Sequence, residues 1–204
     1  MDNRLKDYAK LIAKRGINVQ KGEEVWVTAS LDQPEFVRLV VEELYKAGAK
    51  FVKVNWFDDI VSKSTYKHAS LSTLSKVSPI RLAELKYRKK KLPSTLYIES
   101  SDPNVFKGIN QNKITKARMK SYPKIKPYVD AMDGKYKWSI AAVPNAQWAK
   151  MVFPNDSEDV AVEKLWNAIF ETSRVDGNDP VENWNKHNQD LLEKRKKLES
   201  LGLV

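Results

Sequence analysis

Apolar positions along the chain follow two periods, and segments of the two kinds alternate. In residues 3–14 apolar side chains recur three or four positions apart, which is typical of one face of a helix. Residues 24–30 form a short run rich in β-branched and aromatic side chains, which predicts a strand. Asp32 and Pro34 suit the start of a second helix, and a second strand is predicted at residues 50–56. The chain therefore opens as helix, strand, helix and strand.

The same alternation continues through the rest of the sequence. Further helices are predicted at residues 78–91, 112–132, 157–173 and 180–200, and further strands at residues 95–99 and 136–143. Pro123 and Pro127 should kink or split the long helix that contains them. The strand at residues 136–143 is the most hydrophobic of the four, which predicts a central position in the sheet.

This order of elements predicts an α/β protein. Strands joined by helix-length connections pair in parallel, so we expect a three-layer sandwich in which helices cover both faces of a mostly parallel sheet of about four or five strands. Residues 1–175 form the α/β domain in this interpretation, and residues 176–204 form a C-terminal helical extension. Trp26, Trp138 and Trp166 lie in apolar strand or helix faces and are expected to be buried.

The composition and the motifs exclude several classes of catalytic, metal and nucleotide-binding site. The 204 residues include no cysteine, which excludes a disulfide, a thiolate zinc site, a cysteine nucleophile and an iron–sulfur cluster. The two histidines, His68 and His187, belong to no H-E-x-x-H motif. The seven glycines are too far apart for a G-x-G-x-x-G turn or a phosphate-binding P-loop, and no serine lies in a G-x-S-x-G elbow. No catalytic constellation is complete in this sequence.

The sequence predicts a cytoplasmic protein without a membrane partner. No apolar stretch approaches the roughly 20 residues that a bilayer span requires. Charges are scattered through residues 1–14, so the separate apolar segment of a signal peptide is not found there. The lack of cysteine fits the same compartment.

Acidic and amide side chains follow the predicted strands. In open α/β sheets ligands bind beyond the carboxyl ends of the strands, where a metal ion or a substrate ammonium would meet these groups. The side chains at these ends are Asp32, Asp58, Asp59, Glu99, Asp102 and Asn145. Asp32, Asp58 and Asp102 also stand directly before helical segments, where a carboxylate caps the first turn. Capping is the interpretation we favour over a metal site.

Positive charge is concentrated in the middle of the chain. The formal net charge is +10, and residues 61–135 contain 17 Lys or Arg against 5 Asp or Glu. Such a region can bind a phosphate backbone, or it can be the solvated outer face of two helices. No nucleic-acid motif accompanies it, so we favour the solvated face and do not expect a nucleic-acid partner. A nucleic-acid or polyanion-binding module using residues 61–135 remains the alternative function.

One block of sequence points to a family. The order VPNAQWAKMVFP, LWNAIF and RVDGNDP, at residues 143–154, 165–170 and 174–180, resembles the thermophilic-type metal-dependent aminopeptidases of peptidase family M29. Shorter stretches agree with it: VQKGEEV at 19–25, AGAKFV at 47–52, IES at 98–100 and KGIN at 107–110. The resemblance covers nearly the whole chain and implies the N-terminal domain of such an enzyme.

The resemblance implies that this chain and the catalytic domain are separate parts of a longer protein. Family members are two-metal enzymes that remove N-terminal residues from peptides, and their Glu, His and Asp ligands lie in a C-terminal domain. None of those ligand motifs is present here, so we assign no catalytic, cofactor-binding or metal-binding residue to this chain. Zinc, cobalt or manganese ions would be held by the parent enzyme, with none bound by this chain. The resemblance also implies peptide substrates and a homodimer that encloses a shared cavity.

The N-terminal domain would then shape the wall and the entrance of that cavity. Pro144, Asn145 and Trp148 follow the most apolar strand at the carboxyl edge, and we expect them to face the cavity. Pro144 stiffens the turn, Asn145 can cap the short helix that follows, and Trp148 offers a large flat surface. The alternative, weighted equally, is that Trp148 packs under that helix as part of the core.

Overall fold

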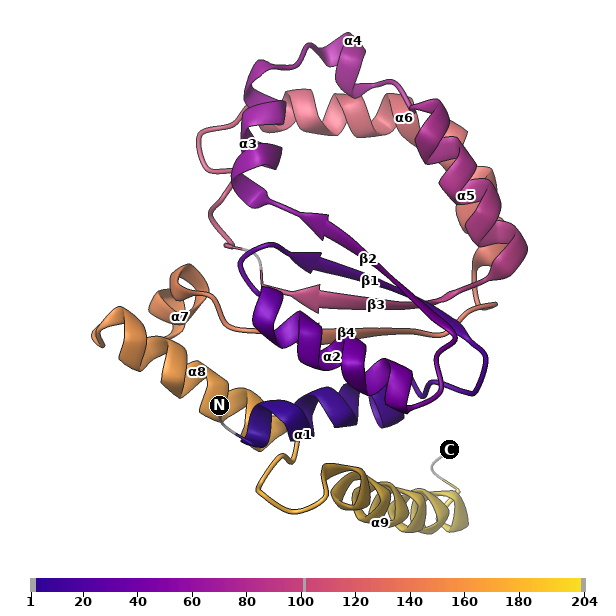
Figure 1. The fold of residues 1–204 in the computed structure, drawn as a ribbon, viewed down its shortest axis with the longest axis vertical. Coiled ribbons are helices and arrows are strands. Elements are labelled where there is room, and N and C mark those ends of the chain that lie inside the picture. The colour runs from indigo at the N-terminus through magenta and orange to yellow at the C-terminus, as the bar shows by residue number, and fades with distance from the viewer. Residues whose placement is uncertain (1–2, 101, 203–204) are drawn as a thin grey trace.

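A parallel sheet of four strands organises the structure, a computed structural model that describes residues 3–100 and 102–202 (Figure 1). The strands are β1 (Glu24–Ser30), β2 (Phe51–Phe57), β3 (Ser94–Glu99) and β4 (Trp138–Ala142). They lie in the order β2-β1-β3-β4, and each neighbouring pair is parallel. The predicted α/β architecture with a C-terminal helix is confirmed.

Helices connect and cover the strands. They are α1 (Asn3–Leu11) with the π-helical turn η1 (Ile12–Gly16), α2 (Pro34–Lys46), α3 (Asp59–His68), α4 (Leu71–Leu74), α5 (Pro79–Lys91), α6 (Gln111–Met132), α7 (Ala146–Val152), α8 (Glu158–Thr172) and α9 (Pro180–Ser200). The sequence patterns did not predict α3 and α4. α6 remains one helix through Pro123 and Pro127 and changes direction along its length (Figure 1), so of the predicted kink or split only the split does not occur. In the part of the chain that the structure describes, no helix combines the length and the apolar character needed to cross a membrane.

β4 lies at the edge of the sheet, and the prediction of a central position is wrong. Its run of apolar residues suggested burial on both faces, but only the face that carries Ala141 is buried. Trp138 and Ile140 point to the other face, where they are 62% and 61% exposed. The expected burial of Trp138 is therefore also wrong. β1 and β3 occupy the centre instead.

One face of the sheet carries the main hydrophobic core. Alternate residues of β1 and β3, among them Val25, Val27 and Leu96, point to this face and are fully buried. α1, α2 and α8 lie on this side of the sheet (Figure 1), and their apolar side chains cover the face. Because burying one such side chain contributes roughly 1.5–3 kcal/mol, this layer holds the sheet and its helices together.

Aromatic rings join the helices on this face. Tyr8 stacks on Phe36 with ring centroids 5.5 Å apart, and Trp166 stacks on Phe170 at 5.2 Å. Trp166 is half-buried in this group and packs against the main core, so it is less enclosed than its apolar helix face suggested. Trp26, at 6% exposure, confirms the expected burial, although it lies on the opposite face of the sheet.

Trp26 anchors the second helical layer. Its ring stacks on Tyr87 of α5 at 5.9 Å, and the Lys53 ammonium lies 4.0 Å from the ring centroid. Lys53 also forms a salt bridge of 2.8 Å with Glu84 of α5. These contacts attach α5 to β1 and β2 through aromatic and charged groups.

We call the four helices α3, α4, α5 and α6 the helical arch, because together they curve over this second face (Figure 1). α5 and α6 contact each other, and α4 contacts α6. The arch buries a small apolar set of its own: Leu85, Ile114, Ala117 and Met132. Helices thus lie on both faces of the sheet, with the larger core under α1, α2 and α8.

α9 attaches to the rest of the molecule at its beginning. Lys10 of α1 forms a salt bridge of 2.8 Å with Asp179, which caps α9. The Trp184 indole N–H donates to the Ser173 carbonyl at 2.8 Å. Residues 189–202 are all exposed, so the later turns of α9 project from the α/β unit. The boundary predicted at residue 175 stays a prediction.

Candidate functional site

The carboxyl ends of the four parallel strands meet at one edge, and the loops there are linked by hydrogen bonds. The buried Ser100 follows β3, and its hydroxyl lies 3.3 Å from Asp32 Oδ2, after β1. The Asn145 amide, after β4, donates to the Ser100 carbonyl. Gln33 Nε2 donates to the Pro144 carbonyl at 2.9 Å. The loops after β1, β3 and β4 therefore form one connected polar network.

The predicted cavity residues occupy the β4 side of this network. Asn145 is buried, and its Oδ1 accepts a hydrogen bond from the Trp148 backbone N–H at 2.7 Å, which confirms its predicted capping of α7. Pro144 is buried as well. Trp148 is half-buried and packs against the main core. That these three residues face a substrate cavity stays a prediction, and the packing of Trp148 agrees with the core alternative.

The carboxylates of this edge have different roles. Asp58 caps α3 by accepting from the Val61 N–H at 2.8 Å, as predicted. Asp102 accepts from the Asn104 N–H at 2.8 Å but begins a turn rather than a helix. Asp32 does not cap α2, because Gln33 occupies the cap position and Asp32 is held by Ser100. The prediction that these residues cap helices is thus confirmed for Asp58 and wrong for Asp32 and Asp102.

Asp59 lies where the negative charges of the edge converge. Burial raises the pKa of the Asp59 carboxyl, and the charges of Asp32, Glu99 and Asp102 raise it further. A hydrogen bond from the Asp102 backbone offsets part of this rise. The edge is therefore an acidic surface that favours cations and disfavours anions.

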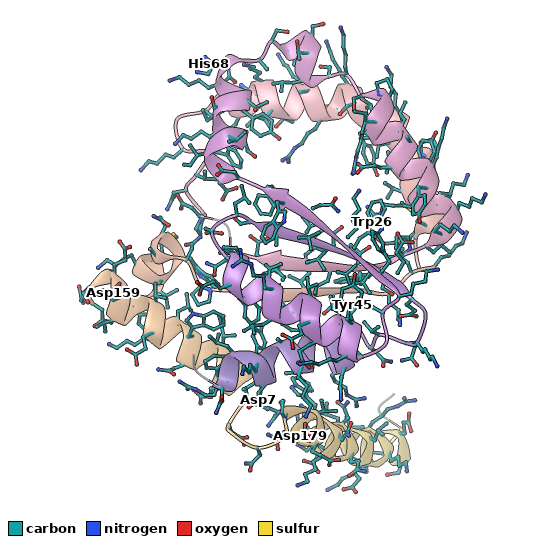
Figure 2. The ribbon with its side chains drawn as sticks, in the orientation of Figure 1. Asp7, Trp26, Tyr45, His68, Asp159 and Asp179 are labelled. Atoms are coloured by element: carbon teal, nitrogen blue, oxygen red, sulfur yellow. The ribbon has the colours of Figure 1, made fainter. Side chains whose placement is uncertain are left out.

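These groups do not fit a metal centre. Within residues 3–100 and 102–202, no three His, Asp or Glu side chains are placed to hold one metal ion. His68 lies on the helical arch, at the opposite end of the molecule from Asp179 at the start of α9 (Figure 2). His187, on α9, contacts the Arg174 guanidinium at 3.1 Å. The described side chains accordingly form no set of ligands for a metal ion.

Sequence reasoning did not single out Ser100 or Gln33. Ser100 is 1% exposed and connects Asp32 with Asn145, so it is the centre of the network. Ser100 could have been recognised from its position directly after a predicted strand. The same criterion identified Asn145 as a candidate site residue.

The basic segment forms the exposed surface of the arch. Its lysines include Lys86, Lys89, Lys90 and Lys91 on α5 and Lys116, Lys120 and Lys124 on α6, all exposed. Among the described side chains of these two helices, the salt bridges are Arg81 with Glu84, Lys53 with Glu84 and Lys126 with Asp130. Most of the described cations of α5 and α6 are therefore exposed and form no salt bridge.

Comparison with known proteins gives a consistent result. A family model described as thermophilic metalloprotease (M29) matches residues 1–203. Aminopeptidase PepS of Streptococcus thermophilus is 38% identical over 185 residues, 90% of this chain and 45% of its own length. Aminopeptidase AmpS of Bacillus subtilis is 37% identical over 194 residues, 94% of this chain and 47% of its own length.

A solved structure shares the fold. The wild-type AmpT structure from Thermus thermophilus superposes with a TM-score of 0.83 at 29% identity, and the match covers 97% of this chain and 49% of that one. The chain thus spans about half the length of the relatives it matches.

Proposed function

The chain belongs to the M29 family of thermophilic metalloproteases, and from this premise we propose that it is the N-terminal part of a cytoplasmic aminopeptidase that removes N-terminal residues from peptides. The observation that carries the proposal is the alignment of nine-tenths or more of the chain with proteins named aminopeptidases. The shared fold of the AmpT structure supports it.

In this proposal the chemistry belongs to the part of the protein that this chain does not cover. Two divalent ions, zinc, cobalt or manganese, supply an activated water and polarise the scissile carbonyl in such a reaction. The side chains described here do not fit those ions. We therefore assign this part of the protein to substrate enclosure and assembly, including a homodimer, and not to bond cleavage.

We place the wall of the substrate cavity at the carboxyl edge of the sheet, with Pro144, Asn145 and Trp148. Two hydrogen bonds, one of them buried, support a rigid wall: the Pro144 carbonyl accepts from Gln33, and the buried Asn145 amide donates to the Ser100 carbonyl. A fixed backbone at this point would hold the Trp148 ring in one position. Positions fixed in this way distinguish substrates by size, because the wall cannot move to admit a larger residue.

Trp148→Ala in the longer protein tests this assignment. We expect a changed ratio of kcat/KM between substrates with large and small N-terminal residues, because the variant removes a flat wall. Gln147→Ala, an exposed change on the same helix, is the control and should leave the ratio unaltered. An unaltered ratio for Trp148→Ala with a loss of roughly 3–5 kcal/mol in unfolding free energy would show a core role instead. Failure of the metal-loaded longer protein to hydrolyse aminoacyl substrates would refute the aminopeptidase function itself.

The exposed cations of the arch favour one second candidate, a polyanion-binding module. Binding to a phosphate backbone weakens steeply with salt because condensed counterions are released. If this function holds, the chain should be retained on heparin, and Lys89→Glu with Lys90→Glu should elute at lower salt. Elution unaltered by this double change would exclude the arch as the binding surface.

A further inference from the structure

The outer edge of β4 presents backbone groups without a strand partner in the described part of the chain. The Thr95 N–H donates to the Lys137 carbonyl at 2.9 Å, which fixes the residues of β4 that face β3. Backbone groups along a strand alternate between its two sides, so Trp138 and Ile140 direct their N–H and C=O groups outward. A second extended segment could pair with these groups.

The far end of this open run is closed by a side chain. The Ala142 carbonyl also points outward, and it accepts a hydrogen bond from the Tyr8 hydroxyl at 3.2 Å. Room along the edge thus extends from Trp138 to the N–H of Ala142. At about 3.3 Å per residue these four steps give about 13 Å, which is space for about four residues of an added strand.

A groove of about 550 Å³ runs beside this edge. Its walls come from α1, η1, β4 and α9, and its lining includes Leu11, Ile12, Arg15, Ile140 and Trp184. Arg15 is the charged residue of this lining, is exposed, and forms no salt bridge with a carboxylate in the described ranges. The groove therefore combines an apolar surface with one available cation.

Apolar side chains continue on the adjoining sheet face. Trp138 and Ile140 are 62% and 61% exposed, and Tyr97, paired with Ile140 in β3, is 36% exposed. An edge strand with free backbone groups and exposed apolar residues is a template for pairing with another chain. Such a surface is suited to binding an extended peptide through main-chain hydrogen bonds and alternate side chains.

We propose that the outer edge of β4 binds the C-terminal part of a short peptide substrate as an added strand, with the peptide's terminal carboxylate paired to Arg15. This inference rests on the proposed function in taking peptides as substrates. Charge complementarity selects the occupant, because the groove offers a guanidinium and its lining contains no carboxylate. A guanidinium binds a carboxylate through two parallel hydrogen bonds.

The direction of the bound peptide follows from the position of Arg15. Gly16 lies against the Ser139 hydroxyl, so Arg15 is near the beginning of β4. β4 ends at the loop that begins with Pro144, which we propose as cavity wall. A peptide antiparallel to β4 would place its carboxylate at Arg15 and direct its amino end toward that loop. The edge would thus hold the tail of a substrate whose N-terminus is being processed.

Binding of the tetrapeptide Ala-Leu-Val-Leu to this chain tests the carboxylate contact. We expect the free acid to bind about tenfold more tightly than its C-terminal amide in calorimetric titration, the usual scale for losing a hydrogen-bonded ion pair. Arg15→Gln should bring the affinity for the acid to that for the amide and leave the affinity for the amide unaltered. Equal binding of acid and amide to the unmodified chain would overturn the proposal, as would no binding of either.

Ile140→Pro tests the backbone contact. It removes an N–H that points away from β3, a position where an edge strand tolerates proline. Ile140→Thr is the matched control, because it keeps this N–H and the β-branched shape. We expect the proline variant to lose at least about tenfold in affinity while the threonine variant loses far less. Equal affinities for the two variants, with native spectra for both, would show that the edge does not pair.

Two further results separate this inference from its competitors. If the unmodified chain sediments as a dimer and Ile140→Pro converts it to a monomer, the edge binds a second copy and the peptide proposal is wrong. If the longer protein cleaves peptides but no tail binding is found, this inference fails and the proposed function stands. If the chain binds the tetrapeptide as described and the longer protein does not cleave it, the proposed function fails alone.

Discussion

Asp59, at the carboxyl edge, is subject to opposing electrostatic effects on its charged carboxylate. It is the first residue of α3, where the helix dipole favours a negative charge. Burial and the charges of Asp32, Glu99 and Asp102 nevertheless raise the pKa of its carboxyl. The ionised form is thus less stable in the folded chain than in the unfolded chain. Such a cost is commonly found where a surface serves binding rather than stability.

This conflict predicts a pH-dependent gain of stability for Asp59→Asn. Because the folded pKa lies above the unfolded value, the charged carboxyl costs stability at neutral pH, and that cost disappears as the pH falls below the unfolded pKa of about 3.9. Asn keeps an oxygen for the Asp102 backbone hydrogen bond. We expect a higher melting temperature than that of the unmodified chain at pH 7 and no difference near pH 3.

The control for this prediction is Asp58→Asn. It removes one negative charge from the neighbouring position, and Asn caps a helix about as well as Asp, so the cap of α3 is kept. Thermal melts of both variants across pH separate the two explanations. An equal gain in both variants would show a general effect of net charge and contradict the role assigned to Asp59.

At the scale of elements, α9 depends on a few contacts at its first turn. Asp179 accepts from the Val181 N–H at 2.9 Å and pairs with Lys10 of α1. The Lys10 ammonium is the main cause that lowers the pKa of the Asp179 carboxyl. One side chain therefore caps the helix and links it to the α/β unit.

Asp179→Ala should release the beginning of α9. Loss of a cap costs typically about 1 kcal/mol, and the surface salt bridge adds at most about the same. We expect faster proteolysis within residues 180–200 and a small decrease in unfolding free energy, measured by urea denaturation. Asp179→Asn keeps the cap without the ion pair and should show a smaller effect. Proteolysis of the alanine variant at the unmodified rate would mean that other contacts, such as those of Asn183 and Trp184, anchor α9 without Asp179.

Local patterns predicted the elements better than their arrangement. β1 and α9 occupy the predicted residues because alternation, helical spacing and capping residues are local signals. α3 was missed because none of its residues is buried, so it has no apolar face to detect. The edge position of β4 depends on which strands pair, and hydrophobicity alone does not encode pairing.

At the candidate site, too, local contacts could be predicted from the sequence and long-range contacts could not. The capping of α7 by Asn145 could be predicted, because its partner lies three residues away. The contacts of Ser100 with Asp32 and Asn145 join residues 68 and 45 positions apart, so only the folded sheet brings them together. Asp32, expected to cap α2, is diverted to one of these long-range contacts.

At the scale of the whole molecule, opposite charges occupy different parts. Asp32, Asp59, Glu99 and Asp102 gather at the carboxyl edge, while lysines and arginines dominate the helical arch. The acidic edge attracts cations, but an attractive field is not a coordination site, because a hard metal ion requires several oxygen ligands at fixed short distances. The distinction leads to a prediction about divalent ions.

Zinc, cobalt or manganese at micromolar concentration should neither stabilise this chain nor make it an aminopeptidase. A ligand that binds only the folded state raises the melting temperature by mass action, so a specific site would be visible in a thermal melt. No suitable group of His, Asp or Glu exists among the described residues, and we expect melts with each metal and with chelator to coincide. Hydrolysis of leucyl-p-nitroanilide should not exceed that of a buffer with the same metal, whereas the longer protein should cleave it. A metal-dependent rise in melting temperature, accompanied by turnover that survives repeated purification, would place the catalytic centre in this half of the protein after all.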